Sequence, residues 1–523
     1  MTSRYYDAVV LGRSLGSLAA AALLARRDFR VLLLGQGQRP SSYVFERHLL
    51  RRRSFTLLAG SSPAWQRVLQ ELAQSPRFRR RMRPLDPMFV MLSESRRVEV
   101  PPDMELFARE IDREFPEVRQ LVDELYTSFA QVNAAADAAF ERDAVWPPGN
   151  LWERIETGRA AATLPFVGGD AQQDLLGKFP SGHPYRDLVT IPSLFASHLS
   201  ARADQLPPFA LARLHGAWTR GVQAFGRGED ELAEFLIERI EAHGGECRLD
   251  ARATAIVVRG GAVAGIMQSG EDEPTGTSAV VSDQSGELVA DLAAGEGITK
   301  KARRDWPRLT AAAGRFVVSL VVKRESLPEP LGDEAFIVPA PRSRPDPRRP
   351  IIHLQRVDPA QQPDAPVESV QEALLVAEIL LPTRGPLTVL EAREAVLGTL
   401  REYLPFLEEN LLVVDSAYDG LPLWQYADGV RREIDRIHVP GSGSGAESLP
   451  RLWSVESPGY LDLCGEPVRG PIPGTYLVGR TVVPALGQEG ELLAAWGAAR
   501  IVTRRDRTRQ KMRRQMWSKI ETN

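Results

Sequence analysis

The first 34 residues hold the feature that most restricts the fold of this chain. Tyr5–Leu11 and Phe29–Leu34 are short apolar runs, which are typical of buried parallel strands. Between them, Leu15–Arg27 has helical composition, and its alanines at 19–22 permit close packing. A strand, a glycine turn, a small-residue helix and a second strand within about thirty residues predict a βαβ dinucleotide-binding unit.

The rest of the chain alternates between α/β segments and a long helical one. Residues 40–215 are interrupted by prolines and show no strand alternation, so we expect helices there. Asp103 is the expected N-cap of a helix that ends before Pro116. Further elements are expected at 231–243, 254–258, 262–267, 316–322, 351–354, 374–381, 389–404, 475–479 and 492–502.

These elements predict an α/β protein whose Rossmann-type domain is built from discontinuous segments. The segments are 1–60, 216–285 and 450–503. Residues 61–215 and 286–449 are expected to form an inserted α+β substrate domain, and 504–523 a basic C-terminal tail.

The turn after the first strand departs from the dinucleotide pattern. In that pattern the first glycine makes the turn, the second lets the diphosphate approach the backbone, and the third lets helix and strand pack closely. Gly12 and Gly16 are present, but Ser14 and Ser17 replace the second and third glycines. Serine is small and donates a hydrogen bond, so phosphate binding is weakened rather than excluded. Arg13 either pairs with the phosphates or crowds them.

The second strand lacks the acidic residue that binds the ribose hydroxyls of a dinucleotide. Gly35 stands there, followed by Gln36. Loss of a charge-assisted hydrogen bond costs about 1.5–3 kcal/mol. Gly35 also removes the carboxylate that would exclude a 2′-phosphate, and Arg39 lies nearby, so an NADP-type site stays open as a third possibility.

Over nearly its full length the chain resembles the phytoene desaturase group of the flavin amine-oxidase-like superfamily. The resemblance rests on the N-terminal βαβ unit, Pro87 and Phe89 with 101–116, Gly226–Gly245 with Ala253 and Ile256, and Gly474–Gly479 followed by Pro484, Gly487 and Gly490. It implies a glutathione-reductase-like FAD domain, an apolar substrate tunnel, and hydride transfer from a polyene or isoprenoid to the flavin.

Several positions depart from this family, and most of them would touch the flavin cofactor. Gln38–Ser42 replaces the family's Gly-Gly-Arg stretch, and Arg480 stands where an acidic residue is expected. Arg227 breaks a double glycine, and Ala253 replaces a larger β-branched residue. The cofactor contacts that the resemblance implies are Gly12, Arg13, Ser14, Gly16, Ser17, Gly35, Ala253, Gly479, Arg480, Gly487 and Gly490.

Two main functions therefore stay open. The first is an FAD-dependent oxidoreductase of the desaturase or isomerase type, acting on an apolar polyene or isoprenoid. The second is a non-catalytic descendant of the fold that has lost FAD and serves as a lipid- or protein-binding scaffold. The Rab GDP-dissociation inhibitors look like a precedent for the second.

No catalytic residue is identified from the sequence. His183 and His215 are candidates for facing a cavity, although a single histidine is more often structural. Cys247 and Cys464 lie far apart without CxxC spacing, so no metal site is expected.

The net charge gives no reason to expect a nucleic-acid partner, and the start of the sequence leads us to expect a cytoplasmic protein. The net charge is -3, and no signal peptide or membrane-length apolar run is present. The segment 504–514 is locally very basic, and Met512, Met516, Trp517 and Ile520 recur at helical spacing. We therefore expect either an amphipathic helix that contacts anionic lipid on the inner face of the membrane or a solvated extension of the last helix.

Overall fold

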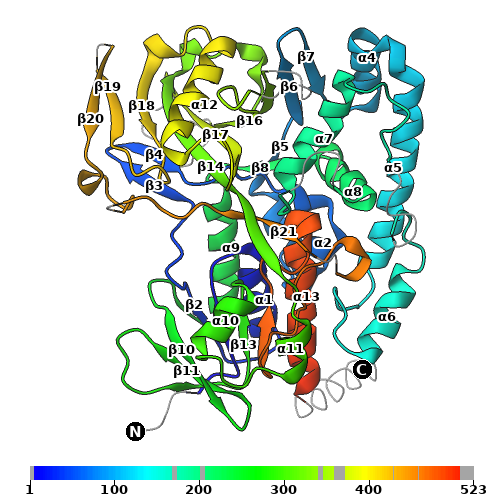
Figure 1. Cartoon of the computed structure of the whole chain (residues 1–523), viewed down its shortest axis with the longest axis vertical. Coiled ribbons are helices and arrows are strands. Elements are labelled where there is room, and N and C mark those ends of the chain that lie inside the picture. Colours follow the sequence, from blue (N-terminus) through cyan, green and yellow to red (C-terminus); the bar gives the residue numbers. More distant parts are fainter. Residues whose placement is uncertain are drawn as a thin grey trace.

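The computed structural model describes residues 5–167, 174–200, 206–339, 346–357, 371–427, 429–443, 445–456 and 459–506. Two sheets dominate the structure, a five-stranded sheet in the lower half of Figure 1 and a ten-stranded sheet in the upper half. Their elements carry two hydrophobic clusters, a larger one around the five-stranded sheet and the helices and a second within the ten-stranded sheet.

The five-stranded sheet is parallel and carries the N-terminal βαβ unit. Its strands follow the spatial order β22-β13-β1-β2-β9, with bounds β1 (Ala8–Leu11), β2 (Val31–Leu34), β9 (Glu246–Arg248), β13 (Val280–Ser282) and β22 (Thr475–Leu477). Val10 of β1 pairs with Leu33 of β2 on one side and Val281 of β13 on the other. Parallel sheets are covered on both faces, which explains why these strands are apolar throughout.

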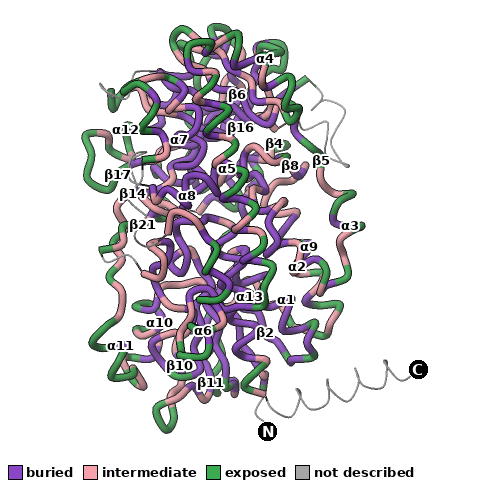
Figure 2. The backbone as a smooth tube through the Cα atoms, turned by 90° about the vertical axis from the view of Figure 1, so that its right-hand side faces the viewer, coloured by how far each residue is buried: buried purple, intermediate pink, exposed green. Residues whose placement is uncertain are grey.

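Helix α1 (Leu15–Arg26) is enclosed on all sides and is buried from Leu15 to Ala25. It contacts α9 (Glu229–Ala242) and α13 (Gly487–Arg505), and Figure 2 shows this part of the molecule as buried. An ideal Cβ on Gly16 would lie 1.9 Å from the carbonyl oxygen of Val478. The start of α1 and the residue after β22 therefore meet backbone to backbone.

The ten-stranded sheet has a core of its own. Its strands follow the spatial order β20-β19-β18-β14-β17-β16-β15-β6-β7, and β21 pairs with β14. The strands are β6 (Phe89–Ser93), β7 (Arg97–Val100), β14 (Leu309–Lys323), β15 (Glu334–Val338), β16 (Ile352–Val357), β17 (Glu372–Pro382), β18 (Leu411–Asp415), β19 (Leu423–Ala427), β20 (Val430–Ile434) and β21 (Arg451–Val455). Helix α12 (Val389–Tyr403) covers it. Arg393 of α12 makes a two-pronged ion pair with Asp419 at 2.7 Å in the buried interior.

The remaining elements are smaller. The remaining strands are β3 (Ser42–Phe45), β4 (His48–Arg51), β5 (Met82–Pro84), β8 (Gln223–Phe225), β10 (Ala253–Arg259), β11 (Ala262–Gln268) and β12 (Thr275–Gly276). The remaining α-helices are α2 (Pro63–Glu71), α3 (Ser75–Arg79), α4 (Met104–Glu114), α5 (Arg119–Phe140), α6 (Leu151–Ala161), α7 (Pro184–Ala196), α8 (Pro208–Thr219), α10 (Gly286–Leu292) and α11 (Lys300–Asp305).

The fold class expected from the sequence is confirmed, but the expectation of a purely helical segment at 40–215 is wrong. Five strands, β3 to β7, lie within it. Each is three to five residues long, and β6 is held by parallel pairing with β15, more than 240 residues away along the chain. β3 and β4 form a local hairpin, whereas β5 pairs with the distant β8. Strands as short as these leave little alternation to detect in the sequence. The Asp103 N-cap is confirmed, because its carboxylate accepts hydrogen bonds from the N–H groups of Glu105 and Leu106.

No helix among the residues that the structure describes is both long enough and apolar enough to cross a membrane. The expectation for the basic tail falls on residues beyond Asp506, which lie outside the described ranges.

The close approach of α1 to Val478 makes a testable prediction. Gly16→Ala should lower the free energy of unfolding by about 1–3 kcal/mol, because its methyl group has no space at a backbone contact. Urea denaturation measures this change.

Gly398→Ala is the matched control, since a Cβ at this glycine of α12 meets nothing within 4 Å. That substitution should raise stability by about 1 kcal/mol through helix propensity. Equal effects of the two substitutions would contradict the packing interpretation.

Candidate functional site

The candidate site is the turn between β1 and α1, where a Rossmann-type fold binds a dinucleotide. Gly12 ends the strand with φ +110°, a conformation that favours glycine. Ser14 is the N-cap of α1. The amino end of a helix presents free N–H groups and a positive dipole end, so it is the natural position for a diphosphate.

In this chain a carboxylate of the protein occupies that position. Asp283 directly follows β13, and its Oδ2 accepts a hydrogen bond from the Ser14 N–H at 3.0 Å. Gln38 Nε2 donates to the same carboxylate at 3.0 and 3.1 Å. An ideal Cβ on Gly12 would lie 2.1 Å from either Asp283 oxygen. The carboxylate therefore fills the space against the turn.

Burial raises the pKa of the Asp283 carboxyl, and the hydrogen bonds from Ser14 and Gln38 offset only part of this effect. The nearby charge of Glu491 raises the pKa further.

Three other N–H groups of the turn also donate to side chains of the protein. Arg13 N–H donates to Gln38 Oε1 at 2.7 Å, and Gly16 N–H donates to Glu491 Oε2 at 3.3 Å. Ser17 N–H donates to Ser14 Oγ at 3.3 Å. The two serines that replace glycines thus act within the turn, since Ser17 Oγ also donates to Leu11 O at 3.2 Å.

Glu491 links the turn to the last helix. Its Oε1 lies 2.9 Å from His198 Nε2 and 3.6 Å from Arg480 Nε. Burial opposes ionisation of Glu491, but the hydrogen bond from His198 and the charge of Arg480 outweigh it and lower the pKa of Glu491. Burial also lowers the pKa of His198 to about 4. Arg480 is therefore paired inside the protein.

The ribose position is closed by backbone atoms. An ideal Cβ on Gly35 would lie 1.9 Å from the carbonyl oxygen of Leu249, just beyond β9. Gly35 N–H donates to Arg248 O at 3.1 Å. No acidic side chain fits at this position unless the backbone moves, so the glycine is a packing requirement.

The strand expected to pass the adenine is occupied as well. Gln36 Oε1 accepts from the Ala253 N–H at 2.9 Å, and Gln36 Nε2 donates to Ala253 O at 3.0 Å. A single carboxamide thus satisfies both backbone groups of Ala253.

The C-terminal glycines have packing roles that need no cofactor. Ideal Cβ atoms on Gly479, Gly487 and Gly490 would lie 2.0, 2.0 and 2.2 Å from the carbonyl oxygens of Asp283, Ala196 and Val483, respectively. Side chains at these positions would break the contacts around the start of α13.

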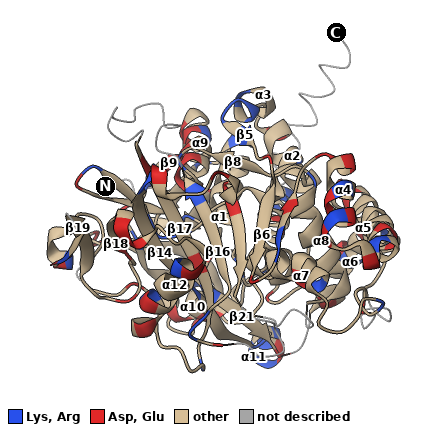
Figure 3. Cartoon of the chain, turned by 90° about the horizontal axis from the view of Figure 1, so that it is seen from above, with Lys and Arg blue, Asp and Glu red and all other residues tan. Residues whose placement is uncertain are grey.

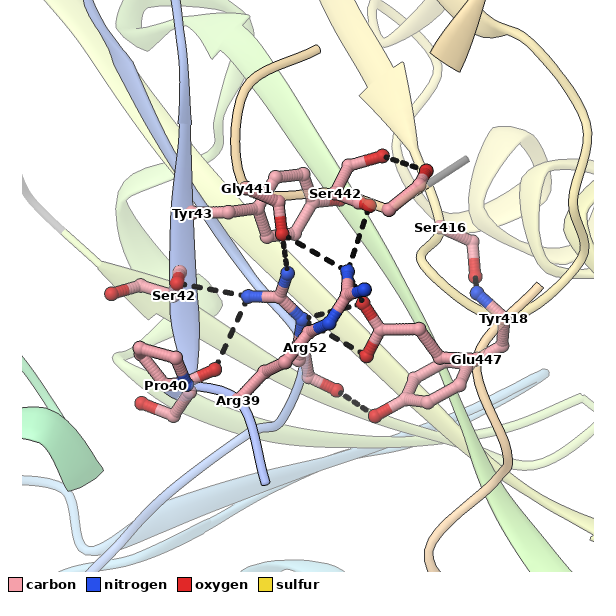
Figure 4. A network of polar contacts seen from close by, with 12 residues as sticks. Arg39, Pro40, Ser42, Tyr43, Arg52, Ser416, Tyr418, Gly441, Ser442 and Glu447 are labelled. Atoms are coloured by element: carbon pink, nitrogen blue, oxygen red, sulfur yellow. Dashed lines mark hydrogen bonds and ion pairs between the residues drawn. The ribbon is translucent and has the colours of Figure 1, made fainter. Parts of the chain in front are cut away.

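The segment that replaces the family's Gly-Gly-Arg stretch is held by two arginines (Figure 4). Arg52 donates to Pro40 O and Ser42 O at 3.1 and 2.9 Å, and its Nε lies 3.0 Å from both oxygens of Glu447. Arg39 Nη1 donates to Ser442 O at 2.9 Å and to Glu447 Oε1 at 3.1 Å. Arg39 thus bonds to the segment 442–447, which argues against its proposed role with a 2′-phosphate.

Arg13 extends from the turn and is partly buried. Burial lowers the pKa of its guanidinium, and Asp230 is the carboxylate that counters this most strongly. The charged side chains that act most strongly on Arg13 are thus those of the protein itself, Asp230, Glu229 and Arg53.

Two pockets among the described residues are small. One, of about 30 Å³, is lined by residues including Arg51, Arg53 and Glu334, and the other, of about 20 Å³, by residues including Leu58 and Gln488. A water molecule needs about 10–15 Å³ on this scale, so each pocket holds only a few waters. Gly12–Ser17 lines neither pocket.

The two candidate histidines hold structural positions. His183 is the N-cap of α7, and its Nε2 lies 2.9 Å from Glu117 Oε1. His215 is 1% exposed and its Nε2 lies 3.0 Å from the Tyr126 hydroxyl. Burial lowers the pKa of His215 to about 4. Among the described residues no group of three or more His, Cys, Asp or Glu side chains has metal-site geometry.

Sequence reasoning missed the residues that fill the site: Gln36, Gln38, Asp283 and Glu491. Asp283 left a readable signal, because it follows an apolar strand whose carboxyl end lies at the same sheet edge as the turn. Glu491 and the glutamines left none, since their partners are fixed only by the fold.

Comparison with known proteins agrees with this architecture. Residues 10–72 match a sequence model described as an NAD(P)-binding Rossmann-like domain. No curated protein gives a significant match to the chain.

Three solved structures illustrate the fold. An oxidoreductase from Methanosarcina mazei is 17% identical, with a TM-score of 0.58 over 95% of this chain and 99% of that chain. Putrescine oxidase bound to putrescine is 15% identical, with a TM-score of 0.52 over 95% and 99%. The flavin-dependent brominase Bmp2 is 10% identical, with a TM-score of 0.43 over 98% and 83%, which is too low for a conclusion. At these identities the first two likenesses establish a shared fold with oxidoreductases.

The raised pKa of Asp283 predicts a pH-dependent effect of Asp283→Asn. A carboxyl whose pKa is higher in the folded than in the unfolded protein loses stability as pH rises from its ordinary value near 4 through the folded value. The variant lacks this loss. Its free energy of unfolding relative to the wild type should therefore rise between about pH 4 and pH 7, by on the order of 1 kcal/mol, in urea titrations at several pH values.

Asp305→Asn is the control for this titration. Asp305 is exposed, and the hydrogen bond from Arg304 lowers the pKa of its carboxyl. The free energy of unfolding of Asp305→Asn relative to the wild type should therefore change with pH in the opposite direction. A flat difference between Asp283→Asn and the wild type would contradict the interpretation.

Proposed function

We propose that this chain is a flavin-free binding protein built on the oxidoreductase fold. The observation that carries the proposal is the Asp283 carboxylate, which is hydrogen-bonded to the Ser14 N–H at the amino end of α1. The diphosphate of FAD would have to take that place.

Two independent obstacles oppose FAD in this site. A diphosphate would displace the hydrogen bonds of Asp283 with Ser14 and Gln38, at about 1.5–3 kcal/mol each for bonds to a charged group. That loss corresponds to roughly two to four decades in affinity. Gly35 adds the second obstacle, because it lacks the carboxylate that would bind the ribose hydroxyls, and a side chain at this position would collide with Leu249 O.

The glycine fingerprint gives no independent support to FAD binding. Gly16, Gly479, Gly487 and Gly490 each face a backbone carbonyl at a distance that only glycine permits. These positions are maintained by packing in a protein that has lost the cofactor as well as in one that keeps it.

The visible absorption spectrum of the purified protein tests the proposal first. We expect a colourless protein that neither quenches the fluorescence of added FAD nor gains thermal stability from it. A stoichiometric flavin spectrum would overturn the proposal.

A second test asks whether the carboxylate is the barrier. Asp283→Asn removes the charge and keeps the shape, so it should bind FAD at least about tenfold more tightly than the wild type. Asp305→Asn, at an exposed position, should behave like the wild type. Identical titrations for all three proteins would remove Asp283 from the explanation.

An FAD-dependent oxidoreductase acting on an apolar polyene or isoprenoid, of the phytoene desaturase type, is the second candidate. It is favoured by one observation, the intact geometry of Gly12 and the N-cap of α1 within the segment that matches the Rossmann-like model. Bound flavin in the first experiment would make this candidate the leading one.

A further inference from the structure

Helix α6 exposes its three large apolar side chains to solvent, whereas two of its polar residues, Glu153 and Thr157, face the protein. Leu151, Trp152 and Ile155 are 71%, 75% and 39% exposed. Glu153 and Thr157 are 5% and 0% exposed. Residues three and four apart share a helix face, so the three apolar side chains form one patch.

Specific contacts fix this inverted orientation. Glu153 forms a capping box with Asn150, and its Oε1 lies 2.5 Å from Arg469 Nη2. Thr157 Oγ1 donates to Val145 O at 2.9 Å. Rotating α6 to bury Trp152 would break these buried bonds, so the protein itself holds the apolar patch outward.

The charge on the exposed face of α6 has one sign. The remaining exposed positions are Arg154, Gly158 and Arg159, and they include no carboxylate. Glu156 at the edge of the face is neutralised by Arg500 of α13, whose Nη1 lies 2.8 Å from Glu156 Oε2. Elsewhere, Figure 3 shows basic and acidic residues interspersed along the ribbon.

The basic end of the chain starts beside this helix. α6 lies near the lower part of α13 in Figure 1, and Arg504 Nη1 is 3.4 Å from Glu156 Oε1. The sequence continues from there with Arg507, Arg509, Lys511 and Arg513-Arg514. Five further cations thus follow within nine residues of the point where the described chain ends.

We propose that the exposed face of α6 docks on an anionic membrane surface. Trp152, with Leu151 and Ile155, enters the boundary between headgroups and acyl chains, a position that tryptophan prefers. Arg154 and Arg159 meet the lipid phosphates, and the basic residues after Asp506 add long-range attraction. This surface goes beyond the proposed function, since it requires neither the presence nor the loss of FAD.

Co-sedimentation of the full-length protein with lipid vesicles tests the proposal. Wild-type protein should bind vesicles of phosphatidylcholine with about 30% phosphatidylserine and bind pure phosphatidylcholine at least tenfold more weakly. Trp152→Ser and Ile155→Ser should each lower binding to the anionic vesicles by about threefold to tenfold, and the double variant further. The double variant Arg154→Glu/Arg159→Glu should lose the preference for phosphatidylserine.

Phe406→Ser is the matched control, because Phe406 is 63% exposed and belongs to the ten-stranded half of the molecule. It should bind vesicles like the wild type. Circular dichroism and gel filtration of each variant exclude unfolding, which is not expected for exposed positions.

Three outcomes would overturn the proposal. They are no sedimentation of the wild type with anionic vesicles, wild-type binding by Trp152→Ser, and a wild-type dimer that Trp152→Ser converts to a monomer. The last would assign the patch to a second copy of the chain.

Discussion

The amino end of helix α1 has free N–H groups that must find acceptors in a buried setting, and the rest of the structure is arranged around that need. Asp283 supplies one acceptor from the end of β13, Gln38 another from the loop after β2, and Glu491 a third from α13. Three separate parts of the chain thus converge on one turn. In a dinucleotide-binding protein the phosphates fill this role, whereas here side chains of the protein accept from the N–H groups of Arg13, Ser14 and Gly16.

The glycines of a nucleotide fingerprint do not by themselves establish that a nucleotide binds, and the reason is physical. A glycine in a nucleotide fingerprint serves either the approach of a ligand or the approach of another backbone, and only the structure tells which. Gly16 meets Val478 O, and Gly479 meets Asp283 O. Selection for packing is enough to retain them. Gln38 and Arg480 bond to Asp283 and Glu491 of the protein, so these departures say more about the site than the glycines that remain.

The sequence predicted the elements whose signal is local. The N-terminal βαβ unit, the Asp103 cap and the hairpin of β10 and β11 follow from short-range periodicity and capping chemistry. The strands β5 and β6 and the Gln36–Ala253 pair depend on partners far along the chain, and their residues resemble loop or helix when taken locally. Helix α6 shows a third case, because Glu153 and Thr157 face inward through contacts with Arg469 and Val145 that no periodicity reveals.

The strand order of the five-stranded sheet also determines when this domain can form during synthesis. β1 begins at Ala8, but its neighbour β13 is not synthesised until Val280. The partner of β13, β22, follows only at Thr475. At roughly 5–20 residues per second, the interval between the first and last strands is on the order of half a minute to a minute and a half. Within that interval the face of α1 that α13 later covers stays uncovered, and the edge of β13 stays unpaired from its own synthesis until β22 follows. Chaperones therefore have a long period in which they can bind this apolar surface during synthesis. That period ends when α13 has been synthesised and covers α1.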